Sequence, residues 1–154
     1  MEKIIYNISV GNASDIDTIA QFQVDMALES EGTNLDLERV TAGVAAAVAD
    51  EYKGTYIIAR DPSGKAIGSL LLTREWSDWT NRWYWWVQSV FVTKEYRGKG
   101  VYRAMYDKVK ALAKENNITQ IRLYVDKTNY PAQMVYKKLG MDETHYLLYE
   151  EVIC

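Results

Sequence analysis

Cysteine and histidine are nearly missing from this sequence, which contains one of each, Cys154 and His145. A single thiol cannot form an internal disulfide, and the two residues together make a poor metal set, so we expect no metal centre. Long apolar runs are also missing: none approaches the roughly 20 residues of a membrane span, and the start MEKIIYNISV lacks the pattern of a secretory leader. We therefore expect a protein of the reducing cytoplasm with no membrane partner.

Basic residues are not in excess, because 18 Lys and Arg face 21 Asp and Glu and the net charge is −3. This balance disfavours a broad nucleic-acid-binding surface, although it is compatible with a local basic site. The length of 154 residues and the hydrophobic content of 48% predict a single globular domain, residues 1–154. Aromatic residues are abundant: there are twelve tyrosines and five tryptophans, and all five tryptophans lie between Trp76 and Trp86.

Hydrophobic periodicity and turn residues predict elements in the order β-α-α-β-β-β-α-β-α-β. Expected strands cover residues 4–10, 55–59, 65–73, 83–92, 118–126 and 144–153. Expected helices run from Asn12 or Ser14 to about residue 30, from Asp36 to beyond Val48, from about 100 to 116, and from Pro131 to Gly140. We therefore expect an α+β fold with a mixed, largely antiparallel central sheet and one β-α-β crossover.

The stretch RGKG at residues 97–100 stands between an expected strand and an expected helix. The first N–H groups of a helix have no partner within the helix, and the helix dipole is positive there. Glycines remove the Cβ atoms that would hold a phosphate away from these donors, and Arg97 and Lys99 add positive charge. The pattern indicates a pyrophosphate site, against the alternative of a solvated basic loop with a glycine at the helix start.

Two segments, VQSVFVTKEYRGKGVY and NYPAQMVYKKLGM, resemble the Gcn5-related N-acetyltransferase (GNAT) superfamily. The pyrophosphate motif of that family, Arg/Gln-x-x-Gly-x-Gly/Ala, is matched at Arg97 and Gly100, while Tyr102 replaces its last small residue. A later Asn-x-x-Ala-x-x-x-Tyr motif is matched at Asn129, Ala132 and Tyr136. The resemblance implies a three-layer α/β/α fold and acetyl coenzyme A (acetyl-CoA) as donor, but it does not identify the acceptor.

The resemblance also implies a set of site residues. Expected coenzyme contacts are Phe91, Val92, Arg97, Gly98, Lys99, Gly100, Val101, Tyr102 and Asn129, the first two through their main chain. Tyr136 is placed near the coenzyme sulfur as the general acid, because a phenol is mostly protonated at neutral pH. The alternative is that Tyr136 only packs, since it shares the apolar stripe of its helix.

The general base is harder to identify, because some relatives have a glutamate near the position of Gln88, and an amide cannot take a proton. Carboxylates that could replace it are Glu29, Glu31, Glu75 and Asp78, and we select Glu31 as the expected catalytic carboxylate. A water chain, or a solvated surface role for each acid, remains an alternative.

Two hypotheses beyond core packing apply to the segment REWSDWTNRWYWW. Trp76 and Trp79 could hold a cationic acceptor by cation–π attraction, or they could contact a partner subunit in a homodimer. We expect an acetyl-CoA-dependent N-acetyltransferase that acts on a primary amine, either a small molecule or a protein. The alternatives are a catalytically weak acetyl-CoA-binding sensor module and, less favoured by charge, a small nucleic-acid-binding domain.

Overall fold

The computed structural model of the protein describes residues 3–154. The chain forms two compact units, the first ending at Leu123 and the second comprising Tyr124–Cys154. The sheet belongs to the first unit, and its strands are β1 (Asn7–Val10), β2 (Thr55–Arg60), β3 (Ala66–Ser77), β4 (Arg82–Val92) and β5 (Ile121–Arg122).

The strands lie in the order β1-β2-β3-β4-β5, so their order in the sheet follows their order in the chain. The pairings from β1 to β4 are antiparallel, and only β4 and β5 run parallel. The predicted α+β fold with a largely antiparallel sheet is thus confirmed. The predicted strand 118–126 is much shorter than expected, because only Ile121 and Arg122 pair with β4.

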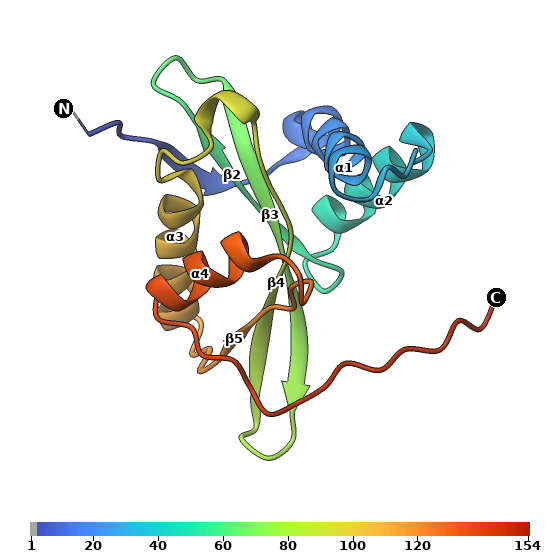
Figure 1. The fold of residues 1–154 in the computed structure, drawn as a ribbon, viewed down its shortest axis with the longest axis vertical. Helices are drawn as coiled ribbons and strands as arrows, with labels where there is room; N and C mark the ends of the chain where they lie inside the picture. The colour runs from blue at the N-terminus through green and yellow to red at the C-terminus, as the bar shows by residue number, and fades with distance from the viewer. Residues whose placement is uncertain (1–2) are drawn as a thin grey trace. The chain divides into compact units, whose positions relative to one another are not determined.

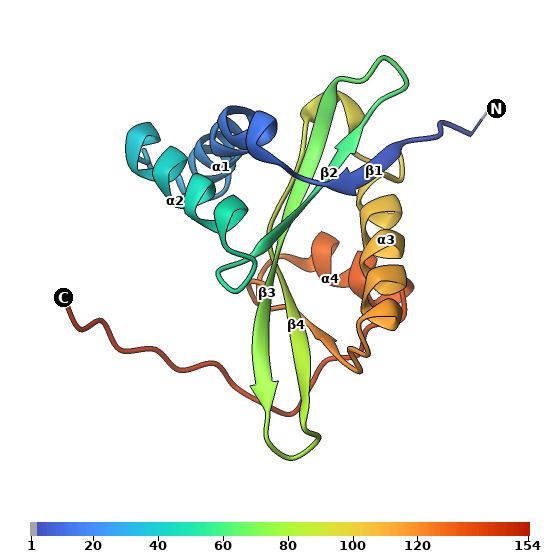
Figure 2. The same cartoon turned by 180° about the vertical axis from the view of Figure 1, so that it is seen from behind.

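The helices of the first unit cover both faces of the sheet and give the three expected layers. The helices α1 (Ile16–Glu31) and α2 (Leu37–Ala49) pack together on one face, and α3 (Val101–Glu115) lies on the other (Figure 1 and Figure 2). Asn12 caps the short 3-10 helix η1 (Ala13–Asp15) before α1, and the Asp36 carboxylate accepts from the first N–H groups of α2. These caps confirm the predicted helix starts.

Two apolar clusters fill the spaces between the layers. On the α3 side, Met105 and Val109 of the helix pack with Ile57, Leu70 and Val87 of the strands. On the α1 and α2 side, the buried residues are Ile19, Ala20, Val44, Ala47, Tyr56 and Ile58. The alternation of Ile57 and Ile58 between the two clusters explains why β2 is a continuous apolar run.

The second unit contains the helix α4 (Tyr130–Lys138) and an extended C-terminal segment. Asn129 Oδ1 accepts from the Ala132 N–H at 3.2 Å, Pro131 lies in the first turn, and Gly140 follows with φ +98°, as predicted for this helix. The predicted strand 144–153 is wrong: these residues are exposed and belong to no strand of the sheet. An alternating pattern predicts a strand conformation but does not provide the neighbouring strand that stabilises it.

Within residues 3–154, no helix has the length and apolar character needed to cross a membrane. No group of three or more His, Cys, Asp or Glu residues in this range is arranged to hold a metal ion.

Candidate functional site

The loop between β4 and α3 has an unusual backbone. It begins with the 3-10 helix η2 (Lys94–Tyr96) and ends at Gly100, which caps α3. Gly98 and Gly100 have φ values of +73° and +81°, and a Cβ atom built on either would meet nothing within 4 Å. Both glycines thus adopt a left-handed conformation that side chains disfavour, and both leave open space in front of the loop.

Two tyrosine hydroxyl groups anchor this loop through hydrogen bonds. Tyr6 Oη donates to the Lys99 carbonyl oxygen at 2.8 Å, and Tyr96 Oη donates to the Asp61 carboxylate at 2.9 Å. Hydrogen bonds from Ser63, and then from Tyr96, lower the pKa of Asp61 to about 2, so this carboxylate is ionised at neutral pH. The loop is therefore fixed by groups that leave its open side clear.

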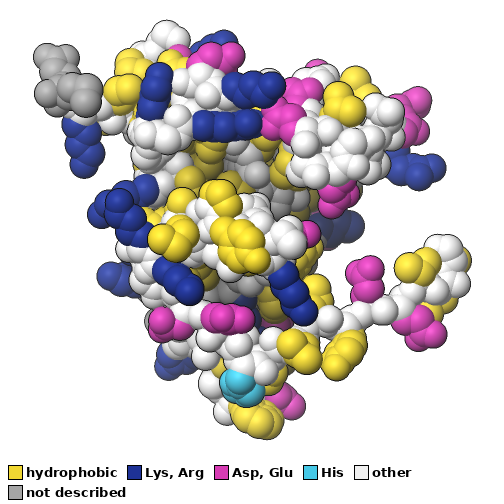
Figure 3. Space-filling model, viewed as in Figure 1, with side chains coloured by type: hydrophobic (Ala, Val, Ile, Leu, Met, Phe, Trp, Pro, Cys, Tyr) yellow, Lys and Arg dark blue, Asp and Glu magenta, His cyan; other side chains and the backbone are white. Residues whose placement is uncertain are grey.

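The open side of the loop coincides with the positive end of α3. Gly98, Lys99 and Gly100 donate no backbone hydrogen bond to any residue in the described range, and the first turn of a helix adds further unpaired N–H groups. Lys and Arg side chains, in dark blue, lie at the top of the view in Figure 3, where Figure 1 shows the loop between β4 and α3. This combination of donors, dipole and charge suits an anion.

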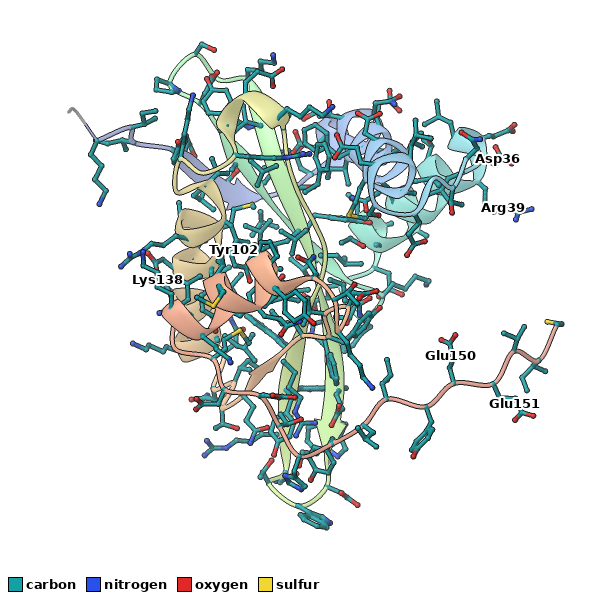
Figure 4. The ribbon with its side chains drawn as sticks, viewed as in Figure 1. Asp36, Arg39, Tyr102, Lys138, Glu150 and Glu151 are labelled. Atoms are coloured by element: carbon teal, nitrogen blue, oxygen red, sulfur yellow. The ribbon has the colours of Figure 1, made fainter. Side chains whose placement is uncertain are left out.

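Val101 and Tyr102 form the first turn of α3. Val101 is buried against the sheet cluster, whereas Tyr102 is half-buried and stacks on Tyr106 with ring centroids 6.0 Å apart (Figure 4). The aromatic residue in place of the usual small one is thus accommodated by stacking along the helix, and the glycine geometry of the loop is retained.

Arg97 links the loop to two other elements. Its Nε donates to the Val92 carbonyl oxygen at 2.8 Å, and its terminal nitrogen lies 2.7 Å from a carboxylate oxygen of Glu29 on α1. Its guanidinium also lies over the Phe91 ring, and that ring packs on Phe22 of α1 with centroids 5.0 Å apart. The Arg97 cation therefore stands between the loop, the end of β4 and the last turn of α1.

The outer edge of β4 is open beside this loop. Two residues of β4, Ser89 and Val90, stand opposite the single residue Leu70 of β3, which is a β-bulge. Ser89 has φ +52°, an unusual conformation for a residue with a side chain. Because β4 pairs with β5 only at Trp85 and Trp86, its edge beyond the bulge has no strand partner among the residues described.

The backbone direction along this edge follows from two contacts. The Phe91 carbonyl oxygen lies on the β3 side, 3.0 Å from where a Cβ on Gly68 would stand. Since successive residues of a strand direct their backbone groups to opposite edges, Val92 directs its N–H and carbonyl oxygen to the open edge. Arg97 already uses that carbonyl oxygen, which agrees with this direction. Val92 therefore presents its main chain at the open edge, whereas the main chain of Phe91, which was also expected to contact the coenzyme, faces β3.

The four candidate carboxylates differ in their hydrogen-bond and ion-pair partners. Glu29 is paired with Arg97 and lies 3.9 Å from Lys94, whereas Glu31, at the end of α1, forms no ion pair within the described range. Glu75 accepts from the Trp86 indole at 3.0 Å and pairs with Arg122 at 3.1 Å. Asp78 lies in the turn between β3 and β4.

Gln88 is not free to act on a substrate proton, because its amide donates to Thr73 Oγ1 at 2.6 Å. Two buried polar atoms on the α1 side, Gln23 Nε2 and Ser69 Oγ, have no hydrogen-bond partner among the residues described. Sequence patterns missed both, since Gln23 follows the helix stripe and Ser69 lies within an apolar strand.

The tryptophan-rich segment lies far from the end of α1. Trp76 is part of β3 rather than a loop, and its ring packs edge to face on Trp83 with centroids 5.0 Å apart. Trp79 is 94% exposed in the turn between β3 and β4. This turn lies at the opposite end of the sheet from α1 and α2 (Figure 1), so the structure does not bring Trp76 and Trp79 near Glu29 and Glu31.

Tyr136 and Asn129 belong to the second unit. Tyr136 lies on α4 and is half-buried, and burial raises the pKa of its phenol above the ordinary value of 10.0. Its hydroxyl therefore keeps its proton at neutral pH. The Asn129 side chain caps α4. Asn129 therefore has a structural role, in addition to the coenzyme contact that the resemblance implies.

Comparisons with known proteins agree on one family. A family model described as the acetyltransferase (GNAT) family matches residues 21–141. The crystal structure of a possible acetyltransferase from Clostridium difficile 630 has 38% sequence identity and a TM-score of 0.90, covering 97% of this chain and 99% of that one. No curated protein matches the sequence.

Two more distant crystal structures show the same fold. A predicted acetyltransferase from Clostridium acetobutylicum, solved with acetyl-CoA, has 22% identity and a TM-score of 0.75, covering 96% of each chain. A ribosomal-protein-alanine N-acetyltransferase from Brucella melitensis biovar Abortus 2308 has 16% identity and a TM-score of 0.78, covering 97% of this chain and 100% of that one.

Proposed function

The chain belongs to the acetyltransferase (GNAT) family, and from this premise we propose that it transfers the acetyl group of acetyl-CoA to a primary amine by direct attack in a ternary complex. Acetyl-CoA is the donor that the family uses. The observation that carries the proposal is the loop with left-handed Gly98 and Gly100 at the start of α3, beside the open edge of β4. The single thiol fits a cytoplasmic location for this activity.

The loop fits the pyrophosphate of the donor. The missing Cβ atoms at Gly98 and Gly100 leave room for a phosphate against the backbone, and the N–H groups from residue 98 to 102 supply donors. Lys99 and Arg97 add two positive charges, although Arg97 must share its guanidinium with Glu29. The acetyl-CoA complex of the Clostridium acetobutylicum relative supports this assignment for the fold.

The open edge of β4 fits the pantetheine arm. An amide chain can pair with an unpaired strand edge as another strand would. Val92 offers its N–H there, and β5 pairs with β4 only at Trp85 and Trp86, before the bulge at Ser89. The bound donor supplies the acetyl group and a thiolate leaving group, and the protein must orient the first and protonate the second.

Tyr136 is the proposed proton donor for the leaving thiolate. A phenol whose pKa is raised by burial holds its proton at neutral pH, so it is in the form that can donate to the sulfur as negative charge develops there. Asn129, which caps the same helix, is proposed to contact the coenzyme with its remaining hydrogen-bonding groups.

The proposed acceptor site lies at the end of α1. Glu31 has no cationic partner among the described side chains, so its carboxylate can attract an ammonium group and then take its proton. Glu29 already neutralises Arg97 and is a weaker candidate. The amine must be neutral to attack, so the rate is expected to rise with pH above neutrality.

A screen of primary amines that follows free thiol release tests this function. Small diamines, amino acids, aminoglycosides and peptides with free N-termini cover the acceptor classes. Thiol release that requires both acetyl-CoA and one of these amines supports the transferase. Donor binding with no amine-dependent release across the screen would instead favour the sensor module.

A further inference from the structure

The residue before β1 contacts the loop between β4 and α3, although the two are far apart in the sequence. Tyr6 directly precedes β1, and its Oη donates to the Lys99 carbonyl oxygen at 2.8 Å across 93 positions of the chain. A motif confined to residues 97–102 cannot reveal this contact, because one partner lies at the other end of the sequence. The geometry of the loop therefore depends on the N-terminal segment.

This hydrogen bond fixes the orientation of one peptide plane in the loop. The Lys99 carbonyl oxygen and the Gly100 N–H belong to the same peptide unit, which is planar and trans, so the two groups point in opposite directions. Because the Tyr6 hydroxyl binds the oxygen, the Gly100 N–H points away from Tyr6. It donates to no backbone acceptor among residues 3–154. Tyr6 thus sets the direction of an unpaired donor at the start of α3.

This peptide plane needs such a restraint because of the residues that flank it. Gly98 and Gly100 lie on either side of Lys99, with φ values of +73° and +81°, and glycine reaches many other backbone conformations without a steric penalty. A ligand that requires one orientation of the plane would otherwise bind against the entropy of the others. A hydrogen bond that holds the plane in the free protein removes part of that cost.

Tyr6 is itself held by a rigid neighbour. Its ring packs on the Tyr96 ring with centroids 6.3 Å apart, and Tyr96 Oη donates to the Asp61 carboxylate in the turn between β2 and β3. Asp61 also accepts from the Ser63 N–H at 2.9 Å, and the Lys99 ammonium lies 5.6 Å from the centre of the Tyr96 ring. This turn and η2 lie side by side at one end of the sheet (Figure 1 and Figure 2). The Tyr6 hydroxyl therefore has a fixed position.

We propose that Tyr6 is a positioning residue for the coenzyme: its hydroxyl holds the Lys99–Gly100 peptide so that the Gly100 N–H is directed at the pyrophosphate of acetyl-CoA before the donor binds. Tyr6 acts through this peptide and not by contact with the coenzyme. The inference rests on the proposed use of the loop as the pyrophosphate site. It adds a residue of the N-terminal segment to that site.

Tyr6→Phe tests the proposal, because it removes the hydroxyl and keeps the ring that packs on Tyr96. In calorimetric titration the dissociation constant for acetyl-CoA should rise by about three- to tenfold, the factor that one hydrogen bond accounts for. The constant for pantetheine, which lacks the pyrophosphate, should not change. The matched control is Tyr56→Phe in β2, which loses its hydroxyl in the cluster on the α1 and α2 side and should keep both constants. A merely structural role of the Tyr6 hydroxyl would leave the ratio of the two constants unchanged.

Nuclear magnetic resonance of protein labelled with ¹⁵N-glycine observes the peptide itself. A hydrogen bond to the Lys99 carbonyl polarises the peptide unit, so the Gly100 nitrogen resonance should move in Tyr6→Phe and stay in place in Tyr56→Phe. An unmoved Gly100 resonance, or equal rises in the constants for acetyl-CoA and pantetheine, would overturn the proposal.

The variant Gly100→Asp separates this inference from the assignment on which it rests. If Gly100→Asp loses acetyl-CoA while Tyr6→Phe binds it as the wild type does, the positioning role is overturned and the pyrophosphate site stands. If Gly100→Asp binds acetyl-CoA as the wild type does, the loop is not the pyrophosphate site, and both proposals are overturned.

Discussion

Replacing Gly100 by alanine separates the backbone geometry of the loop between β4 and α3 from its proposed contacts with the coenzyme. Gly100 has φ +81°, and an added Cβ would meet no protein atom within 4 Å, so the substitution introduces strain without a clash. A residue with a side chain in this conformation costs about 1–2 kcal/mol. Gly64, with φ +89° in the turn between β2 and β3, is equally open, which makes Gly64→Ala a matched control.

Both variants should melt below the wild type by similar amounts. For a chain of this size, 1 kcal/mol corresponds to about 2–4 °C, so the strain lowers the melting temperature by about 2–8 °C. Acetyl-CoA at one hundred times its dissociation constant stabilises the folded state by about 2.7 kcal/mol, or about 5–11 °C. The turn of Gly64 contacts the loop through the Asp61 side chain, but a Cβ added at Gly64 meets no atom within 4 Å, so Gly64→Ala should keep this gain.

Gly100→Ala should lose most of the gain, because its methyl group occupies the space that the phosphate needs. Gly100→Asp adds a negative charge at the same place and should abolish the gain. Differential scanning calorimetry with and without acetyl-CoA measures each shift, and pantetheine, which lacks the pyrophosphate, should give a much smaller one. Equal coenzyme shifts in the wild type, Gly64→Ala and Gly100→Asp would refute the assignment of the loop.

Three further predictions concern single side chains. Tyr136→Phe removes only the hydroxyl, so turnover should fall by roughly 10- to 1000-fold while the melting temperature stays near that of the wild type; unchanged turnover in a steady-state assay would assign Tyr136 to packing. Asp61 has its pKa lowered to about 2 from 3.8, so its ionised form stabilises the folded state above pH 3.8, and this contribution is lost as the pH falls through about 2. Urea unfolding should therefore show a flatter dependence on pH between roughly 4 and 2 in Asp61→Asn, and parallel profiles would contradict the prediction. Glu29→Gln removes a carboxylate that competes for the loop cation, so the dissociation constant for acetyl-CoA should fall by up to about fivefold in calorimetric titration, with Glu31→Gln as the unaffected control.

Local signals predicted most of the fold. The caps at Asn12 and Asp36, and the Pro131 and Gly140 pair around α4, each act within one turn of a helix, so their effect can be read from neighbouring residues. The strand 144–153 was predicted wrongly because its pattern is local, whereas the neighbour that a strand requires is not. The paired part of β5 was overestimated for the same reason.

The candidate site was predictable only in part. The spacing of Gly98 and Gly100 after a strand and before a helix identified the loop, and the structure shows their left-handed conformations. The bulge at Ser89 left no trace in the sequence, since serine has no special preference for φ +52°. The ion pair of Arg97 with Glu29 joins residues 68 positions apart and depends on how α1 packs beside the loop.

The strand order described above has a consequence for how the chain folds. Since β1 to β4 pair with neighbours in chain order, most of the sheet forms from contacts that need no residue beyond Val92. The parallel contact of β5 with β4 must wait for the α3 crossover to close, and such closure is slow because its entropy is lost before any contact compensates. The loop between β4 and α3, the proposed coenzyme site, lies at the junction between the early hairpins and the late crossover. We therefore expect the donor to retard the unfolding of the crossover and to leave the rate at which the hairpins form unchanged.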